Sequence, residues 1–146
     1  MTTLNPILEE PQRSSAIKEL SSFAENTAEK QSGITGMTIK TGLKTARKMD
    51  ANIVERGVNR LLPDTVEALN PLWAEYNQND SQEGFGEYLA AHSTQATDAL
   101  LAVGDRHAEK LGGSLGSAYS ALRGKASKII APTLPELGAI LERHAA

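Results

Sequence analysis

Apolar residues recur at helical spacing along almost the whole chain, and the alternating pattern of a β-strand is absent. Aromatic residues make up only 4% of the sequence, so alanine and leucine must fill most of a core, which suits closely packed helices. A chain of 146 residues is long enough to form one such core. The sequence therefore predicts an all-α fold, with residues 1–146 forming a single compact bundle of about seven to eight short helices.

Prolines and glycines predict where these helices begin and end. Pro11 fits the first position of a helix, and Pro63 is expected to start another helix in the same way. Pro71 should kink or split that helix. Gly33 and Gly36 are expected to interrupt the chain before a further helix begins. Other expected boundaries are helix ends near Met49 and Gly112, and helix starts near Asn52, Ser81, Ser93 and Leu134.

The composition excludes several classes of protein. The chain has no cysteine, which rules out disulfides, thiolate nucleophiles and cysteine-bound metals. Its first residues lack the basic and apolar regions of a secretory signal. Its longest apolar run, residues 99–103, is far shorter than the ~20 residues that span a bilayer. We therefore expect a cytoplasmic protein without a transmembrane segment.

The charges are segregated along the chain, although the net charge is only −3. Residues 30–60 carry seven Lys or Arg and two Asp or Glu, whereas residues 61–109 carry nine Asp or Glu and one Arg. A chain polarised in this way can attract a charged partner, or it can pair with a second copy of itself, basic segment to acidic segment. A homodimer held by this charge difference is one expectation.

A basic stripe lies within the positive segment. Its four Lys and Arg residues recur at spacings that place them on one face of a helix, opposite the apolar residues of that segment. They are Lys40, Lys44, Arg47 and Lys48. Such a face could bind a phosphate backbone, an anionic membrane or an acidic protein surface, or it could be only the solvated side of a helix. Nucleic acid is the weaker alternative, because no aromatic residue interleaves with the stripe to stack on bases.

A second candidate surface is aromatic. Trp73 and Tyr76 precede a polar stretch at residues 77–82, and Phe85 and Tyr88 follow it. These four side chains could form the hot spot of an interface, or they could line a pocket for a small ligand between helices. They could equally be a core cluster that joins two helices.

No residue pattern indicates catalysis, a metal or a cofactor. The histidines, at positions 92, 107 and 144, lie on different expected helices without zinc-binding spacing, and the acidic residues between 64 and 87 do not match a calcium loop. The glycine-rich residues 112–116 do not fit a phosphate-binding loop, and no serine lies in a nucleophile elbow. We therefore expect a protein that is not an enzyme and that carries no cofactor.

Several short segments occur in an order that resembles a known family. They are Ser32-Gly33-Ile34-Thr35-Gly36 followed by Ile39-Lys40, Leu61-Leu62-Pro63-Asp64, Trp73-Ala74-Glu75-Tyr76, Phe85-Gly86 with Tyr88-Leu89, Asp98-Ala99-Leu100-Leu101, and Tyr119 with Leu122-Arg123-Gly124-Lys125-Ala126. Together they are similar to a family of small helical proteins from actinobacteria that is classed as a domain of unknown function. The resemblance implies an all-α fold and a cytoplasmic setting, and it brings no activity, cofactor or catalytic residue.

These observations favour a non-catalytic helical interaction module that binds a protein partner or a second copy of itself. The basic stripe and the aromatic group are its expected contact surfaces. The alternative is a binder of a small hydrophobic or lipid-like ligand, held between helices around Trp73, Phe85 and Tyr88.

Overall fold

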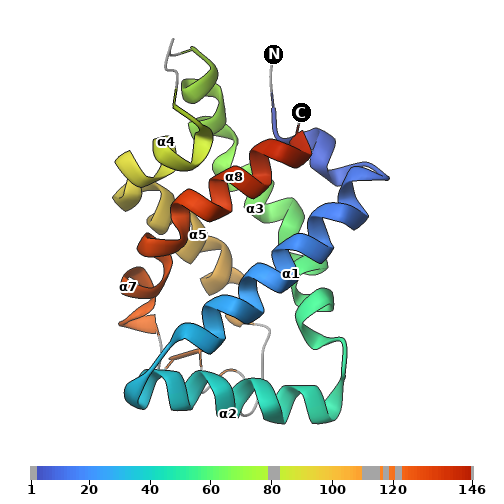
Figure 1. The fold of residues 1–146 in the computed structure, drawn as a ribbon, viewed down its shortest axis with the longest axis vertical. Helices are drawn as coiled ribbons and strands as arrows, with labels where there is room; N and C mark the ends of the chain where they lie inside the picture. The colour runs from blue at the N-terminus through green and yellow to red at the C-terminus, as the bar shows by residue number, and fades with distance from the viewer. Residues whose placement is uncertain (1–2, 79–82, 110–115, 117–118, 121–122, 146) are drawn as a thin grey trace.

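The computed structural model describes all residues except 1–2, 79–82, 110–115, 117–118, 121–122 and 146 (Figure 1). Within the described residues every regular element is a helix, which confirms the predicted all-α fold. The elements are, in chain order, the 3-10 helix η1 (Asn5–Leu8), α1 (Gln12–Lys30), α2 (Gly33–Met49), α3 (Ile53–Gln78), α4 (Phe85–Ala91), α5 (Ser93–Ala108), α7 (Ala126–Ile130), the 3-10 helix η2 (Ala131–Thr133) and α8 (Leu134–Ala145).

α3 continues through both of its prolines, so the predicted helix start at Pro63 is wrong, and Pro71 does not split the helix. Pro63 has no N–H to donate to the carbonyl of Asn59 one turn earlier. Instead, the guanidinium of Arg13 on α1 donates to that carbonyl oxygen over 3.3 Å and to the Asn59 side-chain oxygen over 2.8 Å. Buried residues on both sides of Pro63 also anchor α3 in the core, so packing outweighs the local break.

The turn between α1 and α2 is tighter than the sequence predicts. α2 begins at Gly33, and Gly36 lies within its first turn, so the predicted interruption through Gly36 is wrong. Gly33 has a φ of +68°, a backbone conformation that favours glycine, and the chain turns there from α1 into α2. Predicted boundaries that agree with the structure are those near Pro11, Met49, Ser93 and Leu134. The boundaries predicted at Ser81 and Gly112 lie outside the described residues.

The molecule has a body of packed helices, with α2 lying across one end of it. The helices of the body are α1, α3, α4, α5 and α8. Figure 1 shows α1 and α8 running diagonally over the body, with α4 and α5 to one side. α8 packs most extensively on α4 and also on α1, while α3 packs on α5 and α1. α2 lies across the end of the molecule farthest from both termini, and it packs mainly on α1 (Figure 1).

The hydrophobic core lies in the body and extends from η1 to α8. Its buried members are Leu4, Ile7, Ala16, Leu20, Leu62, Val66, Leu69, Leu72, Trp73, Phe85, Tyr88, Leu89, Ala96, Leu134, Leu137, Ile140 and Leu141. Among the described residues, no member of this core comes from α2. α2 therefore lies outside this cluster: its Ala46 is buried elsewhere, and its apolar side chains Ile39 and Leu43 are only half-buried.

α4 and α8 approach each other at two glycines. A Cβ atom added to Gly86 would lie 2.1 Å from the carbonyl oxygen of Pro135, and one added to Gly138 would lie 2.4 Å from the Cα atom of Gly86. Side-chain atoms do not fit at such distances in a close-packed interior, so this helix crossing requires glycine at both positions.

The Gly86→Ala variant should lower the free energy of unfolding by at least about 2 kcal/mol, because its methyl group would force α4 away from α8. Gly57→Ala is the matched control, since a Cβ there, in the second turn of α3, meets nothing within 4 Å. It should raise stability by about 0.5–1 kcal/mol. Urea unfolding measures both variants, and equal effects would contradict the close approach of α4 and α8.

Candidate functional site

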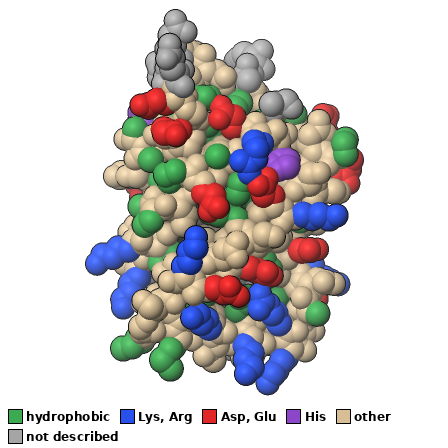
Figure 2. Space-filling model, viewed as in Figure 1, with side chains coloured by type: hydrophobic (Ala, Val, Ile, Leu, Met, Phe, Trp, Pro, Cys, Tyr) green, Lys and Arg blue, Asp and Glu red, His purple; other side chains and the backbone are tan. Residues whose placement is uncertain are grey.

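α2 concentrates positive charge at one end of the molecule. Its 17 residues include four Lys or Arg and no Asp or Glu. Figure 2 shows lysine and arginine side chains over this end of the face in view, with hydrophobic side chains exposed beside them. The other charged side chains on this face include many Asp and Glu residues of the body, which makes α2 the strongly basic element of the surface.

The structure brings the predicted basic stripe together. Lys40, Lys44, Arg47 and Lys48 are all exposed, and all four line one open groove of about 750 Å³ between α1 and α2. Arg47 forms an ion pair of 3.2 Å with Glu25 on α1, and Glu29 of α1 also lines the groove. Within the described part of the chain, no ion pair involves the three lysines of the stripe.

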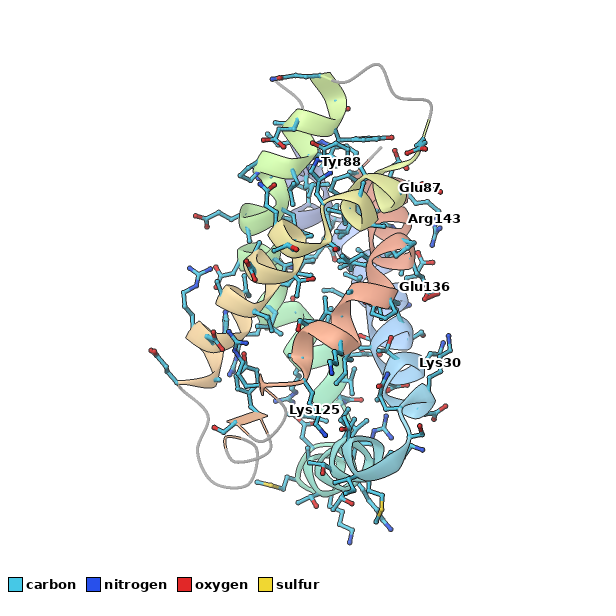
Figure 3. The ribbon with its side chains drawn as sticks, turned by 90° about the vertical axis from the view of Figure 1, so that its left-hand side faces the viewer. Lys30, Glu87, Tyr88, Lys125, Glu136 and Arg143 are labelled. Atoms are coloured by element: carbon cyan, nitrogen blue, oxygen red, sulfur yellow. The ribbon has the colours of Figure 1, made fainter. Side chains whose placement is uncertain are left out.

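α2 also exposes large apolar side chains, which are not among the contact residues predicted from the sequence. Ile34, Met37 and Met49 have exposed fractions of 82%, 70% and 81%, and they are the large hydrophobic residues of the described chain that stand out as exposed. Figure 3 shows the sulfur-bearing side chains extending from α2 away from the body. Helical spacing places Ile34 and Met37 on the opposite side of α2 from Ile39 and Leu43, but spacing alone does not show whether a neighbour covers that side.

A tight turn holds α2 across the end of α1. A Cβ atom added to Gly36 would lie 2.5 Å from the carbonyl oxygen of Gln31, so α2 passes directly over the last residue before the turn. At the same end, the Lys125 ammonium group donates to the Thr35 hydroxyl oxygen over 3.4 Å. These contacts leave the outer face of α2 uncovered by the described residues.

Two apolar grooves lie where α2 meets the body. One, of about 270 Å³, runs between α1, α2 and α3, and the other, of about 340 Å³, lies between α1, α5, α7 and α8. Both include Ala24, Ala28 and Ile39 in their walls. Their size is near the lower limit of about 300 Å³ for small-molecule sites.

The predicted aromatic group comes together, but in the core. The Trp73 and Phe85 rings meet edge to face with centroids 4.8 Å apart, and Tyr76 lies 5.7 Å from Tyr88. Trp73, Phe85 and Tyr88 are buried and Tyr76 is half-buried. None of the grooves described above is lined by these four residues. The cluster joins α3 to α4 and offers a partner little side-chain surface.

The tyrosine hydroxyls are held in place by hydrogen bonds that they donate to carboxylates. Glu142 of α8 accepts a hydrogen bond from the Tyr76 hydroxyl at 2.7 Å, and its other oxygen accepts one from the Phe85 N–H at 3.3 Å. The bond to Glu142, together with burial, raises the pKa of Tyr76 to about 12. Burial and a hydrogen bond to Asp105 likewise raise the pKa of Tyr119 to about 12. Burial, and then Glu75, raises the pKa of Tyr88.

The histidines lie in three separate places. His107 contacts Asp64 at 2.7 Å, His144 contacts Glu19 at 2.8 Å, and His92 contacts the Tyr88 carbonyl oxygen at 2.9 Å. In the ranges that the structure describes, no three His, Asp or Glu side chains are arranged to hold a metal ion. The same described ranges contain no helix long and apolar enough to cross a membrane. Most of the glycine-rich stretch at 112–116 lies outside the described residues.

The raised tyrosine pKa values predict the alkaline behaviour of the chain. Because the folded-state values exceed 10, the neutral phenols contribute stability that is fully present below about pH 10 and is lost as the pH rises toward 12. Most tyrosinate absorbance of the native chain should therefore appear near pH 12, compared with about pH 10 for the urea-unfolded chain. The Tyr76→Phe variant should lose part of this late absorbance, and a native midpoint near pH 10 would contradict the hydrogen bonds described above.

Comparison with known proteins adds one relationship. Neither a curated protein nor a solved structure matches the chain at a significant level. A family model described as a family of unknown function (DUF6918) matches residues 4–145, which is nearly the whole chain. The chain therefore belongs to this family of unknown function, DUF6918.

Proposed function

We propose that this chain is a non-catalytic interaction module and that α2 is its contact surface. The observation that carries the proposal is the composition of the exposed face of α2, which combines four cations, no carboxylate and three exposed large apolar side chains. Surfaces that combine aliphatic and basic side chains without covering elements are typical of sites that bind another surface. The described core cluster contains no residue of α2, so packing in that cluster does not account for this composition.

The non-catalytic part of the proposal is supported by how the ionisable side chains are used. The three histidines make their contacts in three separate places. The carboxylates Glu75, Asp105 and Glu142 accept hydrogen bonds from tyrosines in the fold. General acid–base or nucleophilic catalysis needs such groups close together beside space for a substrate. In the described chain the histidines and these carboxylates instead lie apart from one another, and each of them takes part in a contact within the fold.

The partner in this proposal carries negative charge, and a second copy of the chain supplies one such surface. The acidic segment at 61–109 exposes Glu67, Glu87 and Asp98 on the body, away from α2 in sequence. Pairing this surface with the lysines of α2 would give a homodimer held by the segregated charge. The proposal also includes that the chain works in the cytoplasm and that its family is actinobacterial. It further includes that the macromolecule bound is a protein and not a nucleic acid.

A second candidate function is binding of a small hydrophobic or lipid-like ligand. The two apolar grooves beside α2 favour it, whereas the filled core around Trp73 and Phe85 leaves no described groove there. Native mass spectrometry of the gently purified chain tests this candidate. A bound small-molecule mass would support it, and a clean mass together with no thermal stabilisation by fatty acids would count against it.

Self-association should depend on salt. Light scattering should find a dimer at about 0.01 M salt, where charges interact over about 30 Å, and a monomer at about 1 M, where they interact over about 3 Å. Lys44→Glu should weaken the low-salt dimer by about tenfold, because it reverses a charge at the contact surface. Lys18→Glu makes the same charge change on the exposed side of α1 and should have little effect. A mass that stays monomeric at both salt concentrations would reject self-association.

A further inference from the structure

Charge pairing explains the lysines of α2 but not its exposed apolar side chains. Ile34, Met37 and Met49 are long, flexible or branched residues with more than two thirds of their surface in water. Single exposed hydrophobic residues are common on proteins. Three on one helix that also carries four cations and no carboxylate give the composition of helices that lie in the interface of a membrane.

The positions of these residues match such a role. Ile34, Met37, Lys44 and Lys48 follow one another at spacings of three, seven and four, so they form a stripe along one side of the helix. Ile34 and Met37 lie on the opposite side of the helix from Ile39 and Leu43, which line the apolar groove beneath α2. Lys44 and Lys48 are exposed along the edge of the open groove between α1 and α2. Because α2 lies across the end of the molecule, its whole length can touch a flat surface at once (Figure 1).

More positive charge lies beside α2 at the same end. Figure 3 labels Lys30 and Lys125 toward the α2 end of the molecule, and Lys125 contacts Thr35 at 3.4 Å. The described carboxylates beside α2 include Glu25 and Glu29 of α1 and Asp50, which caps the end of α2. Glu25 is paired with Arg47, and Asp50 is paired with Arg56. The outer face of α2 therefore presents cations and apolar side chains together.

We infer that this outer face of α2 docks onto the surface of an anionic lipid bilayer. Lys40, Lys44 and Lys48 lie among the lipid headgroups, where each lysine strengthens binding by about fivefold. Ile34 and Met37 enter the boundary between headgroups and acyl chains, where burial of each side chain strengthens binding by at least about tenfold. The inference rests on the proposed contact surface at α2, and it is independent of self-association.

A nucleic acid, or a protein surface that offers carboxylates alone, leaves part of these observations unexplained. A nucleic acid backbone would engage the lysines and leave the apolar side chains in water, and the stripe has no aromatic residue on which bases could stack. A protein partner would need its own apolar patch set beside carboxylates. A lipid bilayer with anionic headgroups supplies negative charge for the lysines and an apolar layer for Ile34 and Met37. The two lie close enough together for one helix to contact both.

Vesicle sedimentation with the full chain tests this inference. The chain should bind vesicles that contain phosphatidylglycerol, should not bind vesicles of pure phosphatidylcholine, and should dissociate as the salt concentration rises. The triple variant Lys40→Gln, Lys44→Gln and Lys48→Gln should bind about 100-fold more weakly. The double variant Ile34→Ser and Met37→Ser should bind at least about 100-fold more weakly. The control variant Lys18→Gln should bind as the unaltered chain does.

Tryptophan fluorescence verifies that every variant is folded, because Trp73 is buried in the core and its emission should stay unchanged. Absence of binding to phosphatidylglycerol vesicles at low salt would overturn the inference, and so would equal binding to both kinds of vesicle. Full binding by the Ile34→Ser and Met37→Ser variant would also overturn it, because an apolar contact would then be unnecessary. A chain that stays monomeric in solution yet binds anionic vesicles would reject self-association and support docking, whereas a salt-dependent dimer that ignores vesicles would do the reverse.

Discussion

The close crossing of α4 and α8 at Gly86 and Gly138 is the contact on which the rest of the fold depends. Backbone lies against backbone there, so α8 can sit deep enough to place its buried leucines in the core. The same depth brings Glu142 to the Tyr76 hydroxyl and to the Phe85 N–H at the start of α4. The C-terminal helix thereby joins α3 and α4, which makes the aromatic cluster part of the interior rather than part of the surface.

Because α8 closes the core in this way, α2 is left outside it. The helix is attached through the turn at Gly33 and the close contact of Gly36 with Gln31, and its apolar residues only partly cover the grooves beneath. An element placed like this has little influence on the packing of the body. Packing in the core therefore does not determine the side chains on the surface of α2. This is why the proposed function is argued from the charge and the exposed apolar residues of this helix.

The sequence predicted the helices well where apolar spacing decides the structure, and it failed where tertiary contacts override local signals. Pro63 reads as a helix start, but Arg13 satisfies the carbonyl that this proline leaves without a donor. Helical spacing correctly placed the four cations of α2 on one exposed face. It could not show that Ile34 and Met37 are exposed, because spacing alone does not reveal how many faces of a helix find a neighbour. The burial of Trp73 likewise depended on the depth of α8, which no local pattern encodes.

The composition of α2 links its stability to its contacts. Three glycines and four threonines among its 17 residues are weak helix formers, so the helix has little intrinsic stability. It also packs mainly on one neighbour, which places it among the elements most able to open locally. A surface that binds the outer face would then favour the helical form of α2 as well as the contact itself. The weak intrinsic helix and the exposed amphipathic face therefore both belong to the proposed contact surface, and binding there would stabilise the helix that the structure describes.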